Sequence, residues 1–321
     1  VTVISNVGDN YWLYGMYVCP DIDTIIYGLS GILDEDKGWG VKKDTNNFLR
    51  QMEVFGEETW FRVGDRDAAT HLTRTNMLKN GKNLSDITQW MCEKFAIESK
   101  IIPITDNTVE TRITANGEDL HLQEFWVKHR GRGTIEGIQY VGADKARPNP
   151  DAIAAIQDAE LVVIAPGNPL TSIGPMMGIK GVRKELTKNK KKVVAVSPLV
   201  GNKSFSGPAD KYMEAAGIEV SVFGLAQFYA DVCSKMIIDT KDKAQKSKQS
   251  PMKTWKNIPN IVMETLNHFR QEFKRFNLLN DRKLLREIYH TWRQLKKEMD
   301  KRNLQIFRKS QVVHEDDSNI K

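Results

Sequence analysis

The fold is decided by the stretch Leu161-Val162-Val163-Ile164-Ala165-Pro166-Gly167-Asn168. An unbroken apolar run of this length is typical of a β-strand that is buried on both faces, as in a parallel sheet. The proline, glycine and asparagine that follow end the strand and begin a polar loop that runs to residue 175. This stretch therefore predicts a strand of a parallel sheet with a loop at its carboxyl end.

The same pattern recurs on both sides of this stretch. Helices are predicted over 152–157 and 182–186, and a second apolar strand follows over 192–196. A helix over 211–216 and a third strand over 218–220 complete the series. Alternation of strands and helices with this spacing is the mark of a parallel, doubly wound sheet. We therefore expect an α/β fold, a Rossmann-like parallel sheet with helices on both faces.

Loops that contain glycine, serine and asparagine follow two adjacent predicted strands, at 166–175 and 197–202. In open α/β sheets, ligands bind at the carboxyl ends of the strands, so these loops predict the ligand crevice. Their glycines and hydroxyl groups suit phosphate groups or a nucleotide base. They lack the Gly-Lys-Ser/Thr sequence of a P-loop, which disfavours ATPase-type chemistry.

Acidic residues gather near the amino-terminal end. A short buried strand is predicted over 1–6, and the turn over 7–10 at its carboxyl end contains Asp9. Asp21 and Asp23 then stand at the start of an apolar helix, which either acid can cap, although capping needs only one of them. The pair is therefore one cap with one solvated acid, the commoner arrangement, or a device that holds a metal ion and a phosphate.

A second group of charged residues lies within 60–74 and contains acids, arginines and a histidine, namely Asp65, Arg66, Asp67, His71 and Arg74. The residues after Ala68 predict a helix with Leu72 on its buried side and with Asp67 at the N-cap or in the first turn. Carboxylates that hold a hard cation, beside arginines that hold phosphate oxygens, suit metal–phosphate chemistry. The alternative is a structural network of salt bridges at the start of a helix.

The segment between the first helix and the regular α/β pattern, about residues 30–145, is predicted to be an insertion. Helices are expected over 48–55 and 84–95. Strands over 110–115 and 120–127 are expected to pair through the Asn116-Gly117 turn. The insertion therefore combines helices with a β-hairpin.

The basic excess of the chain lies in its carboxyl-terminal part. The whole chain has a formal net charge of +6, but residues 241–311 alone carry +12, so the rest is acidic. The charge is therefore no sign that the main body binds nucleic acid. We expect an α/β domain over 1–240, a lysine-rich linker over 241–258, a basic helical hairpin or coiled coil over 259–310 and a disordered end over 311–321.

The predicted tail helices each carry a coherent apolar stripe, which favours packing against a partner or within the chain over binding to nucleic acid or anionic lipid.

The chain has 321 residues, of which 40% are hydrophobic, enough for one large or two ordinary domains. No apolar run approaches the ~18 residues of a membrane span. Three widely spaced cysteines argue against disulfides or a zinc site and favour a reducing cytoplasm.

Six motifs occur in order along the chain, namely Cys19-Pro20-Asp21-Ile22-Asp23-Thr24, Gly38-Trp39-Gly40, Gly64-Asp65-Arg66-Asp67 with Ala69-Thr70-His71, Gln123-Glu124-Phe125-Trp126-Val127, Pro166-Gly167-Asn168-Pro169 with Ser172-Ile173-Gly174, and Ser197-Pro198-Leu199-Val200-Gly201. Together they resemble the 2-phospho-L-lactate transferase family of deazaflavin coenzyme (factor 420) biosynthesis. The resemblance covers roughly residues 3–243, and ordered motifs are far more specific than any single one.

The resemblance implies a cytoplasmic, magnesium-dependent enzyme. Such an enzyme transfers a phospholactyl-type group from a guanosine diphosphate-linked donor to the ribityl hydroxyl of the deazaflavin Fo, and GMP leaves. Some relatives use a phosphoenolpyruvate-derived donor. A homodimer without a membrane partner is also implied. The alternative is a non-catalytic nucleotide-sugar-binding regulator of the related gluconeogenesis-factor family, which would not need both pairs of acids.

The resemblance also implies roles for individual residues. Catalytic roles fall to Asp65, Asp67, Arg66 and His71, and magnesium would be held by Asp21, Asp23 and Asp65. Arg66, His71 and Arg74 would clamp phosphate groups. The substrate-binding set is larger and consists of Asp9, Asp21, Asp23, Thr24, Arg74, Trp39, Gly167, Asn168, Pro169, Ser172 and Gly201. The deazaflavin ring would lie against Trp12, Trp39 or Trp126, unless these side chains pack in the core.

The chain departs from the family pattern in three places. The family opens with a strand and a loop of the Gly-Gly-x-Gly type, which this chain lacks, and we expect its affinity for the donor to be weaker for that reason. The linker and tail replace a closing α/β segment with a threonine-rich loop. Asn10 stands where many relatives carry a second acid.

Overall fold

The computed structural model describes residues 1–204, 207–239, 242 and 254–257. The chain divides into two units, Val1–Ile258 and Pro259–Lys321. The predicted helical tail and disordered end lie outside the described residues, as does most of the predicted linker. No helix in the described part of the chain is both long and apolar enough to cross a membrane.

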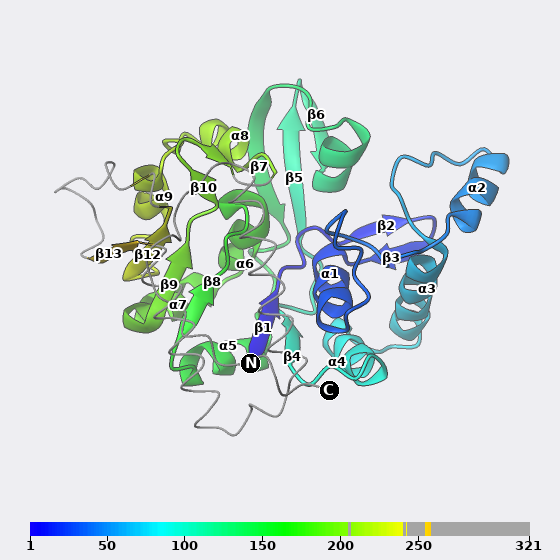
Figure 1. Ribbon diagram of the computed structural model, residues 1–321, viewed down its shortest axis with the longest axis horizontal. Helices are drawn as coiled ribbons and strands as arrows, with labels where there is room; N and C mark the ends of the chain where they lie inside the picture. Colours follow the sequence, from blue (N-terminus) through cyan, green and yellow to red (C-terminus); the bar gives the residue numbers. More distant parts are fainter. Residues whose placement is uncertain (205–206, 240–241, 243–253, 258–321) are drawn as a thin grey trace, which may run out of the picture. The chain divides into compact units, whose positions relative to one another are not determined.

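The largest sheet among the described residues is parallel throughout and has the strand order β13-β12-β9-β8 (Figure 1). Its strands are β8 (Val162–Ile164), β9 (Val193–Val196), β12 (Lys235–Ile238) and β13 (Thr254–Asn257). The intervening helical segments are η2 (Pro169–Ile173), α6 (Gly174–Gly178), α7 (Val182–Lys188), η3 (Lys190–Lys192), α8 (Ala209–Ala215) and α9 (Val222–Phe228). A short antiparallel pair, β10 (Leu199–Val200) with β11 (Lys203–Ser204), follows β9. Parallel strands joined by helices confirm the predicted α/β, Rossmann-like class.

The third strand predicted at 218–220 is wrong, because the chain turns sharply there. Ser221 caps α9, since its Oγ accepts a hydrogen bond from the backbone nitrogen of Gly224 at 3.0 Å. A side chain at Gly224 would collide with the carbonyl oxygen of Glu219, which shows how closely the chain folds back. The strand that continues the sheet is β12, where Met236 lies beside Ala195.

Strand β8 is less buried than its apolar run predicts. It lies at the edge of the sheet as described, with β9 on one side. Val163 is 44% exposed, whereas Ile164 is buried. The prediction of a strand buried on both faces is therefore wrong, because one face of this edge strand stays in contact with solvent.

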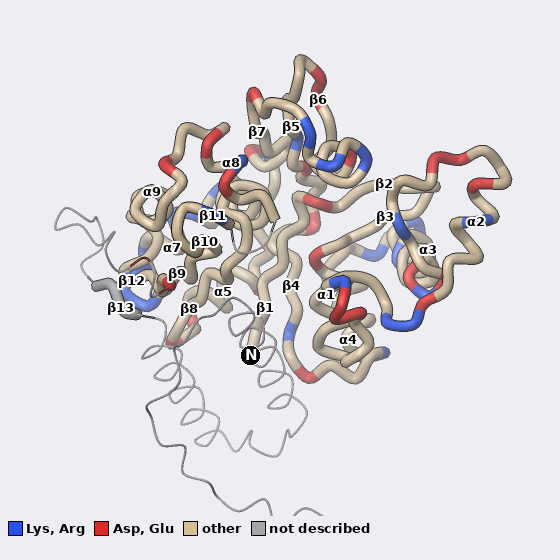
Figure 2. The backbone as a smooth tube through the Cα atoms, turned by 45° about the horizontal axis from the view of Figure 1, so that its top comes forward, with Lys and Arg blue, Asp and Glu red and all other residues tan. Residues whose placement is uncertain are grey.

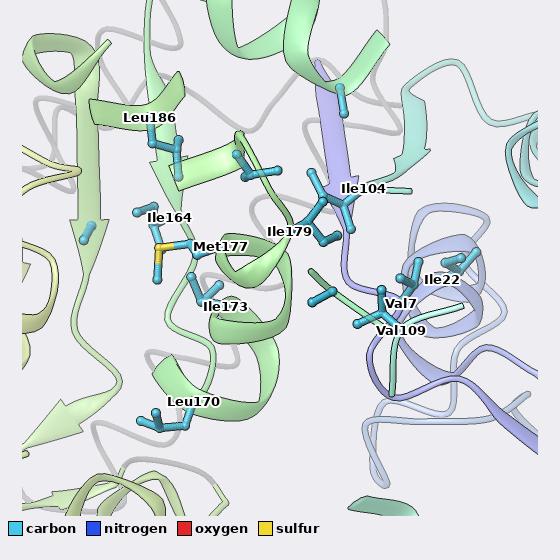
Figure 3. Close-up of a cluster of buried hydrophobic side chains, with 14 of the residues drawn as sticks. Val7, Ile22, Ile104, Val109, Ile164, Leu170, Ile173, Met177, Ile179 and Leu186 are labelled. Atoms are coloured by element: carbon cyan, nitrogen blue, oxygen red, sulfur yellow. The ribbon is translucent and has the colours of Figure 1, made fainter. Parts of the chain in front are cut away.

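A separate parallel pair joins β1 (Thr2–Ser5) to β4 (Lys100–Pro103). Three helices pack against β4, namely α1 (Pro20–Leu29), α4 (Leu84–Lys94) and α5 (Pro150–Asp158). One hydrophobic cluster connects this pair to the main sheet. Figure 3 shows its side chains from Val7 and Ile22, beside α1, to Ile164 and Leu186. A shared core therefore fixes the turn after β1 relative to the loop after β8.

The predicted hairpin forms, but it is shorter than expected and gains a third strand. The antiparallel sheet has the order β6-β5-β7, built from β5 (Glu110–Ala115), β6 (Glu118–His121) and β7 (Ile135–Val141). The strand predicted over 120–127 is wrong beyond His121, because residues 124–128 form a π-helical turn. The carboxylate of Glu124 accepts a hydrogen bond from the backbone nitrogen of His121 at 3.0 Å, which stabilises this change of direction.

A further hairpin, β2 (Tyr11–Leu13) with β3 (Met16–Val18), precedes α1, and the rest of the insertion contains the helices α2 (Asn47–Val54) and α3 (Asp65–Lys79). Figure 2 shows acidic and basic residues along α3 and on the segments beside it. The expectation that Leu72 lies on the buried side is wrong, since Leu72 is 52% exposed. The buried face instead carries Asp67, His71 and Arg74, because α3 packs here through ionic contacts.

Candidate active site

The site begins at the carboxyl end of β1, where the side chain of Asn6 connects three segments. Its Nδ2 donates hydrogen bonds to Asp9 Oδ1 and Asp21 Oδ2, both at 2.9 Å, and lies 3.4 Å from the carbonyl oxygen of Thr171. Its Oδ1 accepts a hydrogen bond from the backbone nitrogen of Gly8 at 2.9 Å. One buried amide thus joins the turn after β1, the first turn of α1 and η2.

The turn after β1 also approaches α6 and β5 closely. A Cβ atom at Gly8 would lie 2.7 Å from Pro175 Cβ and 2.7 Å from Thr111 Oγ1, so a larger residue does not fit without displacement. The backbone nitrogen of Thr111 donates a hydrogen bond to the carbonyl oxygen of Gly8 at 2.7 Å. The structure therefore brings the predicted Asp9 turn next to the predicted ligand loop over 166–175.

Asp9 and Asp21 form an acid pair, the name used below for these two carboxylates and their shared partner Asn6. Burial raises the pKa of Asp9 well above its usual value, and the neighbouring Asp21 carboxylate raises it further. Burial likewise raises the pKa of Asp21, although the Asn6 hydrogen bond opposes the shift at both residues. Two crowded carboxylates of this kind either retain a proton or bind a cation.

Asp23 belongs to a different cluster, which we call the buried ion network and which consists of Asp23, Asp67, His71 and Arg74. Arg74 pairs with both oxygens of Asp23, one of them at 3.1 Å from Nη1. His71 lies between the two acids, with Nδ1 3.4 Å from Asp23 and Nε2 3.4 Å from Asp67. Tyr27 donates a hydrogen bond to Asp67 at 2.7 Å.

The buried ion network carries two acids and two bases whose charges balance. Burial alone would raise the pKa of Asp23, but Arg74 and His71 hold it below its usual value. Burial alone would lower the pKa of His71, but hydrogen bonds and charge from Asp23 and Asp67 raise it to about 9. His71 is therefore protonated at neutral pH, and the network ties α1 to α3 as a neutral unit.

Burial argues against two of the three predicted phosphate clamps. His71 is 1% exposed and Arg74 is 0% exposed, and the Arg74 guanidinium is already bonded to Asp23 and to the carbonyl oxygen of Tyr17. Of the three predicted clamps, Arg66 is the exposed one. The geometry favours a structural role for His71 and Arg74, which hold Asp23 and Asp67 inside the protein.

Asp65 takes part in a reciprocal capping arrangement. Its Oδ1 accepts a hydrogen bond from the backbone nitrogen of Phe48 at 2.8 Å, and its Oδ2 accepts from Thr45 Oγ1 at 2.5 Å and from Asn47 Nδ2 at 2.7 Å. These bonds, that of Thr45 above all, lower the pKa of Asp65. Asp65 therefore caps the start of α2, although it belongs to α3.

Asp44 caps α3 in return. Its carboxylate accepts hydrogen bonds from the backbone nitrogens of Arg66 at 3.0 Å and Asp67 at 3.1 Å. A side chain at Gly64, the N-cap residue, would collide with this carboxylate. The glycine before the acids thus makes room for a cap.

The interpretation of Asp21 and Asp23 as helix caps is wrong. The N-cap of α1 is Cys19, and no side chain accepts a hydrogen bond there. Both acids lie in the first turn, where a carboxylate favours the helix through its dipole. Their side chains bond elsewhere, Asp21 to Asn6 and Asp23 to Arg74.

The predicted nucleotide loop is well ordered by its own hydrogen bonds. Asn168 Oδ1 accepts from the backbone nitrogens of Leu170 at 3.0 Å and Thr171 at 3.3 Å, so it caps η2 just before Pro169. Gly167 lies close to Ser172, since a Cβ atom there would be 3.2 Å from Ser172 Cβ. These residues form one compact loop, and Thr171 connects it to Asn6.

The remaining predicted residues are dispersed. Gly201 has a left-handed backbone (φ 67°) and donates a hydrogen bond from its nitrogen to Asp242 at 3.2 Å. Thr24 is half-buried in α1. The candidate ring-binding tryptophans are partly exposed, at 53% for Trp12 and 42% for both Trp39 and Trp126. Partial exposure leaves all three tryptophans accessible to a ligand.

Magnesium, the implied cofactor, fits the acid pair better than the predicted ligand set. Asp21, Asp23 and Asp65 have separate partners, and within the described residues no group of three or more acids, histidines or cysteines could hold a metal ion. Magnesium in nucleotide sites is held by one or two carboxylates together with substrate phosphates and water. Asp9 and Asp21 supply such a donor set, and their mutual repulsion is the kind that a cation relieves.

Two buried hydroxyl groups near the acid pair, those of Thr111 and Tyr212, have no hydrogen-bond partner among the described residues. Tyr212 lies on α8 and is 2% exposed. Burial first, and then the charge of Asp9, raises the pKa of its phenol. An unpartnered buried hydroxyl is unfavourable, so it marks a position where water or substrate would add a hydrogen bond.

Sequence reasoning missed Asn6, Thr171 and Tyr212. A usable signal existed for Asn6, because it is the first polar amide after β1 and precedes Asp9 by three residues. Thr171 acts through its carbonyl oxygen, and Tyr212 is far away in the sequence. Neither carries a local pattern that would reveal it.

Comparison with known proteins identifies the family. The family model described as 2-phospho-L-lactate transferase CofD matches residues 1–269. The 2-phospho-L-lactate transferase of Methanosarcina mazei is 39% identical over 244 residues, which cover 76% of this chain and 80% of the relative. That of Methanocaldococcus jannaschii is 39% identical over 271 residues, which cover 83% and 86%.

A second name occurs among the relatives. The phosphoenolpyruvate transferase of Mycolicibacterium smegmatis is 35% identical over 246 residues, which cover 74% of this chain and 75% of the relative. Among solved structures, a UPF0052 family protein of Bacillus halodurans is 14% identical with a TM-score of 0.47, and the match covers 74% of this chain and 72% of that one. On the family match and the identities to the transferases, this chain belongs to the 2-phospho-L-lactate transferase CofD family.

Proposed function

We propose that this transferase moves a phospholactyl or phosphoenolpyruvyl-type group from a guanosine diphosphate-linked donor to the ribityl hydroxyl of the deazaflavin Fo, with release of GMP, in factor 420 biosynthesis. The observation that carries the proposal is the acid pair. Asp9 follows the carboxyl end of β1, Asp21 lies in the first turn of α1, and both are joined through Asn6 to the loop after β8. This is the edge of the sheet where α/β proteins bind nucleotides.

The acid pair has the charge that the diphosphate of the donor requires in a metal complex. When magnesium is bound, it neutralises the phosphate oxygens and stabilises the negative charge that develops during transfer. Asp9 and Asp21 would hold it, one carboxylate from each side of the Asn6 amide. Arg66 is exposed at the start of α3 and remains our candidate for a direct phosphate contact.

The transfer itself needs little from the protein beyond position and charge. The acceptor hydroxyl oxygen forms a new bond to the β-phosphorus of the donor, and the bond from that phosphorus to the departing GMP breaks. The hydroxyl proton passes to water, because a carboxylate that holds the cation is a poor proton acceptor. The loop over 166–172 would bind the guanosine part of the donor.

The two names among the relatives leave two donors to compare. Relatives with either name match this chain along about three quarters of its length. A phospholactyl donor and an enolpyruvyl donor differ only in the three-carbon group. The ratio of kcat/KM for the two donors, measured on the same enzyme preparation, identifies the physiological one.

The proposal is tested by incubating the purified protein with magnesium, Fo and each guanosine-linked donor. We expect GMP release together with a phosphorylated deazaflavin. Asp9→Asn and Asp21→Asn should each lower kcat by at least about a hundredfold, since each removes a ligand of the cation that stabilises the developing negative charge. Asp119→Asn is the matched control, because Asp119 is an exposed acid paired with Arg112, and it should change kcat by less than about twofold.

A folded sample that binds Fo but releases no GMP with either donor would overturn the proposal and favour the nucleotide-binding regulator. Equal losses of activity in Asp21→Asn and Asp119→Asn would overturn the role of the acid pair. We include a cytoplasmic homodimer in the proposal. A monomeric mass in light scattering at micromolar concentration would remove the dimer from it.

A further inference from the structure

Both amide hydrogens of Asn6 are used inside the candidate site. Its side chain is 4% exposed. The amide nitrogen has two hydrogens but three acceptors around it, the carboxylates of Asp9 and Asp21 at 2.9 Å and the carbonyl of Thr171 at 3.4 Å. The amide oxygen is bound to the backbone nitrogen of Gly8. The three acceptors therefore compete for two protons.

We infer that Asn6 is a positioning residue that couples the acid pair to the nucleotide loop, so that cation binding at Asp9 and Asp21 strengthens nucleotide binding at the loop over 166–172. This inference rests on the proposed function for the identity of the nucleotide. It concerns the coupling between two sites and not the transfer step.

The direction of the coupling follows from the competition. While the two carboxylates are charged and unpaired, they attract both amide hydrogens, and the carbonyl of Thr171 keeps the longest contact. When a cation neutralises the carboxylates, their attraction for the amide weakens. The amide then bonds more strongly to Thr171, which fixes η2 and the loop before it.

The linkage must work in both directions. If cation binding orders the loop, then nucleotide binding, which also orders the loop, must raise the affinity for the cation by the same factor. Among the described residues, the side chain of Asn6 hydrogen-bonds both to the acid pair and to the loop. Its removal should reduce the coupling in both directions.

The chain supplies a matched control on the same turn. Asn10 is also 4% exposed, and its Nδ2 donates a hydrogen bond to the Tyr17 hydroxyl at 3.2 Å. Its backbone nitrogen donates to the carbonyl oxygen of Val7, so its described hydrogen bonds go to Tyr17 and Val7 and not to Asp9, Asp21 or Thr171. Asn10→Ala therefore removes a buried amide of equal size at the same strand end and leaves the coupling path intact.

The experiment measures Mn²⁺ binding to the full chain by electron paramagnetic resonance, with and without GDP, in wild type, Asn6→Ala, Asn6→Ser and Asn10→Ala. Binding of Mn²⁺ to free GDP is common to all four proteins and cancels in the comparison. We expect GDP to tighten Mn²⁺ binding by about tenfold or more in wild type and Asn10→Ala, and by less than about threefold in Asn6→Ala. Asn6→Ser keeps a short donor and serves if the alanine variant does not fold, which melting curves establish.

Undiminished coupling in a folded Asn6 variant would overturn the inference, as would an equal loss in Asn10→Ala or a wild type without coupling. None of these results depends on Fo or on GMP release. A failed transfer assay with intact, Asn6-dependent coupling would count against the proposed function and leave the inference standing.

Discussion

Asp21 and Asp23 stand two residues apart in the first turn of one helix, yet they belong to opposite kinds of site. Asp21 shares an amide with Asp9 beside the nucleotide loop, and burial raises its pKa. Asp23 is held by Arg74 and His71 in the interior, and its pKa is lowered. Residues two apart on a helix point away from each other, so one motif serves two surfaces.

The two clusters differ in whether their charges repel one another or balance. The acid pair keeps like charges close together with a single amide between them, an arrangement that is unfavourable until a cation arrives. The buried ion network has balanced charges and no need of a ligand. The two clusters should therefore respond in opposite ways when one member is neutralised.

The largest effect is expected from breaking the buried ion network at its cation. Arg74→Met leaves Asp23 buried without its main partner, so the free energy of unfolding should fall by about 3–5 kcal/mol. Urea denaturation followed by tryptophan fluorescence measures the loss. Arg112→Met is the control, since Arg112 forms ion pairs with Glu110 and Asp119 at the surface, and it should cost no more than about 1 kcal/mol. Similar losses in the two variants would contradict the distinction.

The next effect compares the two acids of the motif directly. Asp23→Asn should destabilise the protein by about 3 kcal/mol, because Arg74 loses its counter-charge in the interior. Asp21→Asn removes repulsion with Asp9 and should leave stability unchanged or raise it by up to about 1 kcal/mol in magnesium-free buffer. Calorimetric melting of both variants at neutral pH tests this. A lower melting temperature for Asp21→Asn than for Asp23→Asn would reverse the assignment.

A smaller effect should appear as a dependence on pH. The pKa of His71 is raised to about 9 in the folded protein, so its stabilisation is complete below its ordinary pKa near 6.5 and is lost as pH rises through 9. Between pH 6.5 and 9.5, the wild type should lose on the order of 2 kcal/mol more than His71→Gln, which cannot be charged. Urea titrations at both pH values give the difference. Parallel curves for the two proteins would show that His71 is not protonated in the network.

The smallest effect is expected at Asp65. Asp65→Asn weakens the cap of α2 and should cost about 1 kcal/mol, with transfer activity within about threefold of wild type. Asp86→Asn is the control, because Asp86 is an exposed acid in the first turn of α4, and it should cost less than about 0.5 kcal/mol. A hundredfold loss of kcat in Asp65→Asn at unchanged stability would restore the catalytic role that the family resemblance implies.

Elements with their own apolar pattern could be predicted from the sequence. Strands β1, β8 and β9 and helices α4 and α7 lie within a few residues of their expected places. The prediction of a strand at 218–220 was wrong because three residues in the pattern apolar-acidic-apolar give no sign of the tight turn that Gly224 allows. The prediction for Leu72 was wrong because α3 buries charged side chains, the reverse of the usual pattern for a surface helix.

The sequence could predict which residues make up the site, but not which of them contact one another. The sequence identified the acids at 9, 21, 23, 65 and 67, yet spacing could not show that they divide into three groups. Long-range contacts decide that division, such as Asp23 with Arg74 and Asp65 with Phe48. The acid most prominent in the sequence motif, Asp65, is the one whose oxygens are fully engaged in capping.

The reciprocal caps of Asp44 and Asp65 have a consequence for dynamics. Asp44 holds the first turn of α3, and Asp65 holds the first turn of α2, so neither helix can fray at its start without releasing the other. The segment between them is thereby closed at both ends by hydrogen bonds. In amide hydrogen exchange, the backbone amides of Phe48 and Asp67 should therefore exchange through a single opening event. The first turns of α2 and α3 would then open together as one cooperative unit.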